Sequence, residues 1–189
     1  MLIEVSWLGR GGQGAVTASR ILAKAAVKEK LWAQSIVFFG AERRGAPVYA
    51  YNRLSDKYIK YHHFVHNPDV AIVFDESLLK ITNILDQLKE GGTLILNTRS
   101  KEIPKEIKDK RLRVAVVNAT DIALELKLTV AGIPVVNTAM IGAFAKVMNL
   151  PSIDSVVEAI RDTWSGSVGE LNAEASRRAY TQTKIVKEL

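Results

Sequence analysis

The sequence predicts an α/β fold, because segments typical of buried strands alternate with segments typical of helices along most of its 189 residues. A strand pattern at 2–8 leads through a glycine-rich turn into a helix pattern at 15–30, and from Pro134 onward the patterns are helical. These features predict a Rossmann-like three-layer domain with a mostly parallel sheet, an antiparallel hairpin addition and a helical C-terminal part. The length suits one hydrophobic core, so we expect residues 1–189 to form a single domain.

The first half of the chain carries further strand patterns. Residues 34–39 and 46–53 are rich in β-branched and aromatic residues, which favour strands. Residues 58–64 have a similar composition and follow a short polar turn at 55–57. We therefore expect 46–53 and 58–64 to pair as an antiparallel hairpin added to the sheet.

Three continuous apolar runs have the pattern of strands that are buried on both faces, namely 69–74, 93–96 and 114–117. The expected helices are 75–89 with Asp75 as its N-cap, a short helix opening at 119–121, and then 136–148, 152–163 and 169–187. This alternation favours parallel strands, since the crossovers between parallel strands are usually helical.

The composition is that of a globular protein, with 48% hydrophobic residues, 24% charged residues and a formal net charge of +6. No stretch reaches the roughly 18 apolar residues that cross a bilayer, so we expect no membrane segment and a cytoplasmic location. The chain contains no cysteine, so it cannot itself supply thiolates to an iron–sulfur cluster or act as a thiol nucleophile.

The turn after the first strand has the sequence of an anion-binding loop. It consists of Gly9, Arg10, Gly11, Gly12, Gln13 and Gly14. A strand that ends in glycines before a helix leaves free backbone N–H groups at the positive end of the helix dipole, and the missing Cβ atoms let a phosphate approach. The turn therefore predicts a site for a phosphorylated cofactor. A tight turn that only packs the helix on the sheet is the structural alternative.

Two observations restrict the class of nucleotide at this turn. Gly14 is followed by Ala15-Val16, where a P-loop requires Lys and then Ser or Thr, so nucleotide hydrolysis is not expected. The second expected strand ends at Phe39-Gly40 and offers no carboxylate for the ribose hydroxyls of NAD. An NAD(P)-binding oxidoreductase domain is therefore the less favoured alternative.

A second candidate group is the pair Arg43 and Arg44, which stands in the loop after the second expected strand. That loop lies at the same carboxyl edge of the sheet as the glycine turn, where ligands bind in open α/β sheets. Two guanidinium groups are suited to phosphate or carboxylate groups, whereas a solvated surface loop is the simpler interpretation.

Other kinds of site are not indicated. The three histidines, His62, His63 and His66, lack a complete set of metal ligands, so we expect no metal site. No serine or histidine stands in a recognisable nucleophile motif, so we expect no catalytic residue in this chain. The basic stretch at 99–113 has no interleaved aromatic residues, which argues against nucleic-acid binding.

Two long motifs resemble the gamma subunit of the 2-oxoacid:ferredoxin oxidoreductases, in the pyruvate and 2-oxoisovalerate branch. The first motif runs from Glu4 through the glycine turn to Ala18, and the second runs from Phe38 to Val48. Shorter similar stretches occur at 67–69, 97–98 and 137–143, so the resemblance spans most of the chain.

The resemblance implies a subunit of a heteromeric complex that oxidatively decarboxylates a 2-oxoacid to an acyl-CoA and reduces ferredoxin. In that family, alpha and beta subunits bind thiamine diphosphate, and iron–sulfur clusters lie in beta and in a ferredoxin-like delta subunit. The gamma subunit holds neither cofactor, so this chain is expected to be a non-catalytic subunit. The gamma-type domain is associated with coenzyme A, the acyl acceptor.

The resemblance also implies roles for individual residues. It places the phosphates of coenzyme A at the turn residues Gly9, Arg10, Gly11, Gly12, Gln13 and Gly14, with Thr17 and Ser19 as supporting hydroxyls and Arg43 and Arg44 as cations. Family members with fused subunits often have lysine-rich loops in place of this arginine pair, so the contact geometry there is not carried over. A purely structural subunit, in which the turn binds no cofactor, is the remaining alternative.

Overall fold

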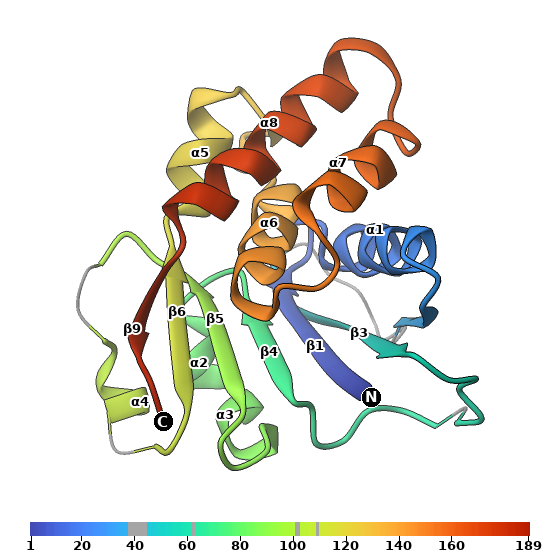
Figure 1. Cartoon of the computed structure of the whole chain (residues 1–189). Helices are drawn as coiled ribbons and strands as arrows, with labels where there is room; N and C mark the ends of the chain where they lie inside the picture. Colours follow the sequence, from blue (N-terminus) through green and yellow to red (C-terminus); the bar gives the residue numbers. More distant parts are fainter. Residues whose placement is uncertain (38–44, 62, 101–102, 109) are drawn as a thin grey trace.

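The described residues of the computed structural model, 1–37, 45–61, 63–100, 103–108 and 110–189, form a seven-stranded sheet between two helical layers (Figure 1). The strands of this sheet are β1 (Leu2–Arg10), β2 (Trp32–Val37), β3 (Pro47–Ser55), β4 (Val70–Val73), β5 (Thr93–Asn97), β6 (Arg113–Val117) and β9 (Lys184–Lys187). Their order is β2-β3-β1-β4-β5-β6-β9. β1, β4, β5 and β6 pair in parallel, whereas β3 and β9 run in the opposite direction. The expected three-layer α/β fold is confirmed.

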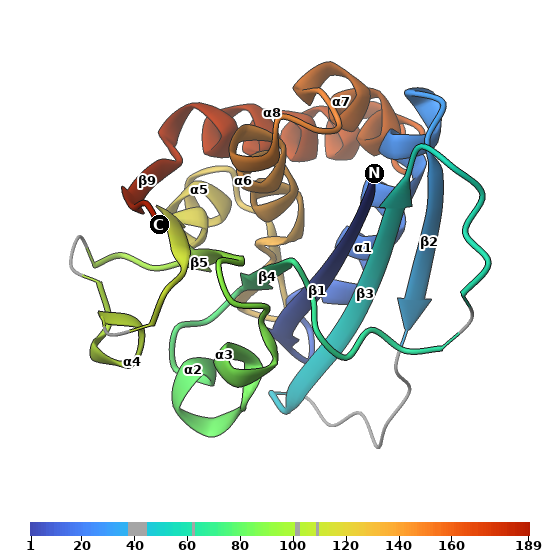
Figure 2. The same cartoon turned by 60° about the horizontal axis from the view of Figure 1, so that its bottom comes forward.

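The helices divide unequally between the two faces of the sheet. They are α1 (Ala15–Lys28), α2 (Leu78–Ile81), α3 (Ile84–Gln87), α4 (Lys105–Lys108), α5 (Ala119–Glu125), α6 (Asn137–Met148), α7 (Ile153–Arg161) and α8 (Gly166–Gln182). One face carries the longer helices, and among the described residues the other face carries the short helices α2, α3 and α4 (Figures 1 and 2). Within the described residues, no helix is both long and apolar enough to span a bilayer.

The alternation of side chains along β1 explains why the sheet has two cores. Val5 and Trp7 point to the side of α1 and α6, where they join the larger core, and Leu8 points to the side of α2 and α3. Trp7 is fully buried, and its indole N–H donates to the Asn52 side chain on β3 at 2.7 Å. This bond satisfies the polar end of the largest buried side chain.

The expected hairpin between 46–53 and 58–64 is wrong. β3 lies between β1 and β2 and pairs with both of them in antiparallel orientation, so neither of its edges is left for another strand. The described part of 58–64 contains no strand. It runs past the sheet and is held by side chains, since the Gln34 amide donates to the Tyr61 carbonyl and the Arg53 guanidinium to that of His63.

The single helix expected at 75–89 is also wrong, because the structure has the short helices α2 and α3 there. α2 ends at Ile81 and is followed by Thr82, whose backbone is extended and whose hydroxyl donates to the Leu78 carbonyl. Threonine and asparagine compete with the helix for backbone hydrogen bonds, which explains a break at Thr82-Asn83. Asp75 is not the N-cap of α2; its carboxylate instead accepts from the N–H of Ser77, two residues along.

The C-terminal helix is shorter than expected. It ends at Gln182, Thr183 is extended, and the β-branched residues that follow form β9, which pairs antiparallel with β6. This strand was not predicted from the sequence, because four residues are too few to show the alternation of apolar and polar side chains that is typical of a strand.

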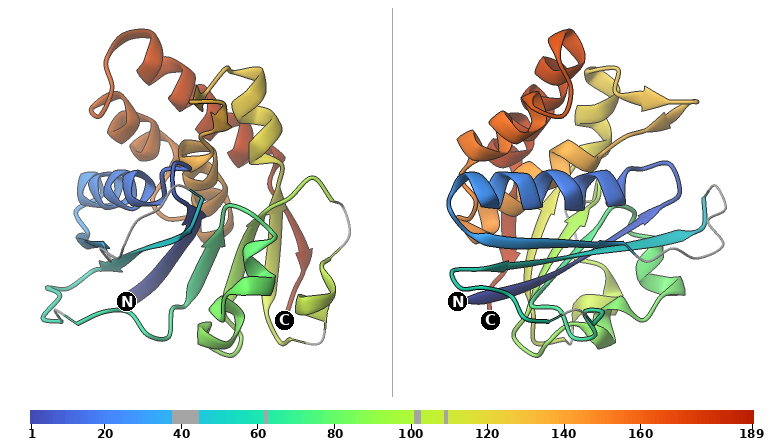
Figure 3. Two further views of the ribbon diagram at one scale, coloured as in Figure 1. Left: turned by 180° about the vertical axis from the view of Figure 1, so that it is seen from behind. Right: turned by 90° about the vertical axis from the view of Figure 1, so that its right-hand side faces the viewer.

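A small hairpin was not expected. It consists of β7 (Thr129–Val130) and β8 (Ile133–Pro134) and projects from the helical side of the molecule (Figure 3). The two residues between the strands, Ala131 and Gly132, both have positive φ angles, which suits a tight two-residue turn.

Candidate functional site

The candidate site lies where the chain changes direction across the sheet. From β1 the chain passes to β2 and β3 on one side, and from there to β4 on the other side of β1. In open α/β sheets, ligands bind at the carboxyl ends of the strands next to such a point. The glycine turn, residues 9–14, stands there between β1 and α1 (Figure 1).

The backbone of the turn has a conformation that favours glycine. Gly12 has a φ of 102° and Gly14 a φ of 86°, both in the region that other residues rarely adopt. The N–H of Gln13 donates to the Arg10 carbonyl at 3.0 Å, and its side-chain carbonyl accepts from the Arg10 N–H at 2.7 Å. Gln13 therefore closes the turn and is placed here as a structural residue.

The N-terminus of α1 is open toward this turn. Gly14 is its N-cap and has no side chain to accept a hydrogen bond, so the first-turn N–H groups lack a side-chain cap. A hollow of about 200 Å³ adjoins it, with walls formed by the turn, the start of α1 and Val48. A Cβ atom added at Gly12 would have its nearest neighbour, the Ile133 side chain, at 3.6 Å. The turn thus has uncapped donors and space beside them.

A second helix begins beside the same turn. Asn137, the first residue of α6, packs so closely on Gly14 that an added Cβ would lie 2.7 Å from its amide nitrogen. Asn137 is buried, and its side-chain oxygen accepts from the N–H of Thr138. The positive ends of α1 and α6 therefore lie next to each other, which increases the attraction for an anion.

Arg10 lines the hollow, but its guanidinium is bound to other segments of the chain and holds them together. Its guanidinium donates to the carboxylate of Asp75 at 2.7 Å, to the hydroxyl of Ser77 at 2.7 Å and to the carbonyl of Gly45 at 2.9 Å. These contacts occupy all three of its nitrogens. Arg10 therefore contributes its backbone to the turn and fixes the surrounding loops, and we do not place its guanidinium at a phosphate.

This contact sets the protonation of Asp75. Burial alone would raise the pKa of Asp75, but the hydrogen bonds from Ser77 and Arg10 outweigh it and hold the pKa below its ordinary value. We expect Asp75→Asn to lower the free energy of unfolding by about 1–2 kcal/mol at neutral pH, since the pair is about one-third exposed and partly screened.

The pH dependence of this effect follows from the direction of the shift. A lowered pKa means that the stabilisation is present above the unfolded value, about 3.9 for aspartate, and is lost as the pH falls through the folded value. Urea unfolding of Arg10→Gln, Asp75→Asn and the double variant measures the coupling. A coupling that is the same at pH 7 and in strong acid would contradict this assignment.

The predicted site residues outside the glycine turn fall into three groups. Thr17 is half-buried in the first turn of α1 and remains a candidate. Ser19 is fully buried, and its hydroxyl bonds to Ser35 and to the Tyr51 carbonyl, so it joins α1 to the sheet and we remove it from the candidate site. Arg43 and Arg44 lie outside the described residues.

A neighbouring cleft of about 300 Å³ contains residues that the sequence analysis did not single out as site residues. Its walls include Asn97 and Thr98 from the end of β5 and Thr120 from α5. The Asn97 amide donates to the Phe74 carbonyl and to the Thr120 hydroxyl, both at 2.8 Å. A polar pair directly after a buried strand is the signal that could have identified this edge.

The cleft and the hollow at the glycine turn differ in the charges that line them. The cleft is lined by the carboxylates of Asp75 and Glu76, and its cation Arg99 already pairs with Asp121. Among the described residues, none that lines the hollow at the glycine turn has an acidic side chain. An anion is therefore better accommodated at the glycine turn than in the cleft.

No metal centre is built from the described residues. They contain no group of three His, Cys, Asp or Glu side chains that could hold an ion. The His63 ring bonds to the Phe64 carbonyl and stacks near His66, and His62 lies outside the described residues.

Comparison with known proteins connects this geometry to one family. The sequence model of the family described as pyruvate ferredoxin/flavodoxin oxidoreductase matches residues 4–182. The pyruvate/ketoisovalerate oxidoreductases common subunit gamma of Thermococcus litoralis is 47% identical over 190 residues, covering 100% of both chains. The pyruvate synthase subunit PorC of Methanothermobacter marburgensis is 45% identical over 183 residues, covering 97% of this chain and 98% of that subunit.

A solved structure agrees with these sequence matches. The crystal structure of pyruvate oxidoreductase subunit PORC from Thermotoga maritima superposes with a TM-score of 0.83 at 36% identity, covering 98% of this chain and 99% of that chain. The likeness therefore includes the whole fold around the candidate site.

Proposed function

Because the chain belongs to the pyruvate ferredoxin/flavodoxin oxidoreductase family, as a gamma-type subunit of a 2-oxoacid:ferredoxin oxidoreductase, we propose that it positions coenzyme A for the complex. The observation that carries the proposal is the uncapped N-terminus of α1, open to a hollow beside the glycine turn. Coenzyme A contains a pyrophosphate, and helix N-termini with adjacent glycines are suited to bind such groups.

The residues at the turn fit a pyrophosphate in three respects. The N–H groups at the start of α1 supply donors, the missing Cβ at Gly12 leaves room, and none of the described lining residues is acidic. The backbone of Gly12, Gly14 and Ala15 would hold the phosphates, with Thr17 as a further donor. The thiol end would then extend toward the partner subunits.

The role of this subunit is orientation rather than bond chemistry. Since the chain has no cysteine, the iron–sulfur clusters belong on other subunits, and we place thiamine diphosphate there too. Those cofactors carry out decarboxylation and pass electrons to ferredoxin. This chain contributes by holding the acyl acceptor in the geometry for transfer, which lowers the entropic part of the barrier.

We propose alpha, beta and delta subunits as the partners, as in the family, with ferredoxin as the electron acceptor of the complex. An exposed aromatic surface supports a role in assembly. Trp32 and Tyr58 are 50% and 61% exposed and contact each other edge to face, and Tyr61 is 52% exposed nearby in the sequence. Aromatic residues are enriched in protein–protein interfaces, so this surface is a candidate contact.

The experiment is an assay of the assembled complex with pyruvate and with 2-oxoisovalerate. We expect ferredoxin reduction and acyl-CoA formation only when coenzyme A is present, and no turnover by the isolated chain. Saturable NAD⁺ binding or NAD⁺ reduction by this chain, without coenzyme A binding, would instead favour the dehydrogenase alternative. Normal coenzyme A dependence in a complex that lacks this chain would leave it a purely structural subunit.

A further inference from the structure

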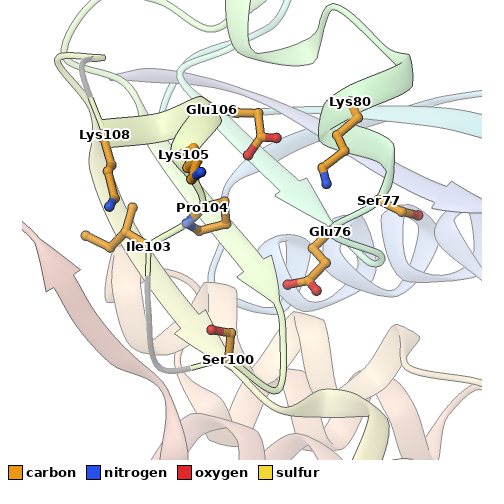
Figure 4. A pocket seen from close by; sticks show the side chains of 9 residues that line it. All are labelled: Glu76, Ser77, Lys80, Ser100, Ile103, Pro104, Lys105, Glu106 and Lys108. Atoms are coloured by element: carbon orange, nitrogen blue, oxygen red, sulfur yellow. The ribbon is translucent and has the colours of Figure 1, made fainter.

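A hollow of about 480 Å³ lies beyond the carboxyl ends of β4 and β5, on the face of the sheet that carries the short helices (Figure 4). Lys80 extends from α2 into the space between α2 and α4, and Lys105 and Lys108 belong to α4 on the opposite wall. None of its lining residues borders the hollow at the glycine turn, so the two spaces are distinct. Nothing in the proposed function uses these lysines.

The charges in this lysine-lined hollow are not balanced within the described residues. Among these residues, none of the three lysines has an ion-pair partner, although Lys89 and Lys110 on the same side of the sheet do. Two carboxylates, Glu76 and Glu106, also line the hollow, so its described lining carries three cations and two anions; the Thr98 hydroxyl donates to Glu76 at 2.5 Å and holds that carboxylate in place. The described lining therefore has a net charge of +1, and its three ammonium groups, which have no ion-pair partner among the described residues, are available to bind the oxygens of an anion.

The walls that carry the lysines are anchored. The side chain of Ile107 in α4 is fully buried, and the ammonium of Lys187 on β9 donates to the carbonyls of Lys108 at 2.9 Å and Lys110 at 2.6 Å. The opposite wall is α2, which is anchored by the buried side chains of Leu78 and Leu79. The backbone positions of the lysines are therefore fixed by the core, and the hollow is part of the fold.

We propose that this hollow binds a nucleoside phosphate with at least two phosphate charges. Its volume falls within the range of small-molecule sites, and lysines are common partners of phosphates. Glu76 and Glu106 can accept hydrogen bonds from ribose hydroxyls, as acidic residues do in dinucleotide sites. Ile103 and Pro104 form an apolar part of the wall for a base.

Two sources can supply this chemistry: a free nucleotide, or the adenosine 3′-phosphate of coenzyme A, which lies beyond the pyrophosphate that the proposed function places at the glycine turn. In the second case the inference rests on the proposed function.

The test measures ADP and coenzyme A binding to the full chain by calorimetry at physiological salt. The variant Lys80→Met/Lys105→Met/Lys108→Met removes the cations, all of which are exposed and safe to replace. The control Lys30→Met/Lys57→Met/Lys60→Met removes the same charge from exposed sites away from the hollow.

We expect the hollow variant to weaken ADP binding at least tenfold and the control to change it less than twofold. If coenzyme A displaces ADP and its own binding also weakens in the hollow variant, the source is coenzyme A. If coenzyme A leaves ADP bound, the source is a free nucleotide. Both results support the site.

The proposal is overturned if neither ligand loses more affinity in the hollow variant than in the control, including the case in which ADP does not bind at all. The variant Gly12→Asp separates this failure from failure of the proposed function. If the glycine turn does not hold coenzyme A, Gly12→Asp leaves the affinity for coenzyme A unchanged, whether or not the affinity for ADP changes. The two ideas therefore fail on different measurements.

Discussion

Replacing Gly12 by aspartate is expected to raise the coenzyme A concentration needed for half-maximal activity of the complex by roughly tenfold or more relative to replacement by asparagine. Gly12 lines the hollow beside the uncapped start of α1, where the proposal places the pyrophosphate, and a Cβ there would make an ordinary contact with the Ile133 side chain at 3.6 Å. A carboxylate there repels the phosphates, and an amide of the same shape does not.

The asparagine variant is the matched control because both side chains impose the same strain on a backbone with a φ of 102°. A steady-state titration of coenzyme A with each purified complex gives the comparison. Equal requirements in the two variants would show that no anion binds next to Gly12, and the turn would then be structural only.

The second large effect is on stability. Gly142→Ala is expected to lower the free energy of unfolding by about 3 kcal/mol, at the upper end for overpacked cores. Gly142 lies in α6 where it crosses α8, and an added Cβ would lie 2.0 Å from the backbone oxygen of Ser176. That oxygen belongs to the helix backbone, so the two helices must move apart to admit a methyl group.

Chemical unfolding of Gly142→Ala and Ser176→Ala makes the comparison. Ser176→Ala changes the same helix crossing but adds no atom, and it removes a buried hydroxyl that has no hydrogen-bond partner among the described residues. We expect that variant to stay within about 1 kcal/mol of the wild type. Similar losses in both variants would contradict the close helix contact.

The parts of the fold that could be read from the sequence are those with a long or buried pattern. The apolar runs at 69–74 and 93–96 became β4 and β5, and the start of α1 followed directly from the glycine turn. The errors concern strand pairing, edge strands and the helix expected at 75–89, which is broken into α2 and α3. Nothing local in 46–53 shows that both of its edges are occupied by β1 and β2, since that depends on contacts between distant segments.

The candidate site was predictable in its backbone but not in its side chains. Glycines before a helix indicate an open N-terminus, and the structure has one beside Gly14. The partners of Arg10, namely Asp75 and Ser77, lie 65 and 67 residues away in the sequence, so its structural role could not be inferred from the motif. Asn137 was missed for the same reason, because its contact with Gly14 joins the starts of two helices.

The most direct test of the central claim is amide hydrogen exchange of the assembled complex with and without saturating coenzyme A. We expect coenzyme A to slow exchange in the peptide that covers residues 9–17, and we expect Gly12→Asp to remove this protection at the same coenzyme A concentration. Unchanged exchange at 9–17 in a complex that is saturated with coenzyme A and active would contradict phosphate binding at the glycine turn.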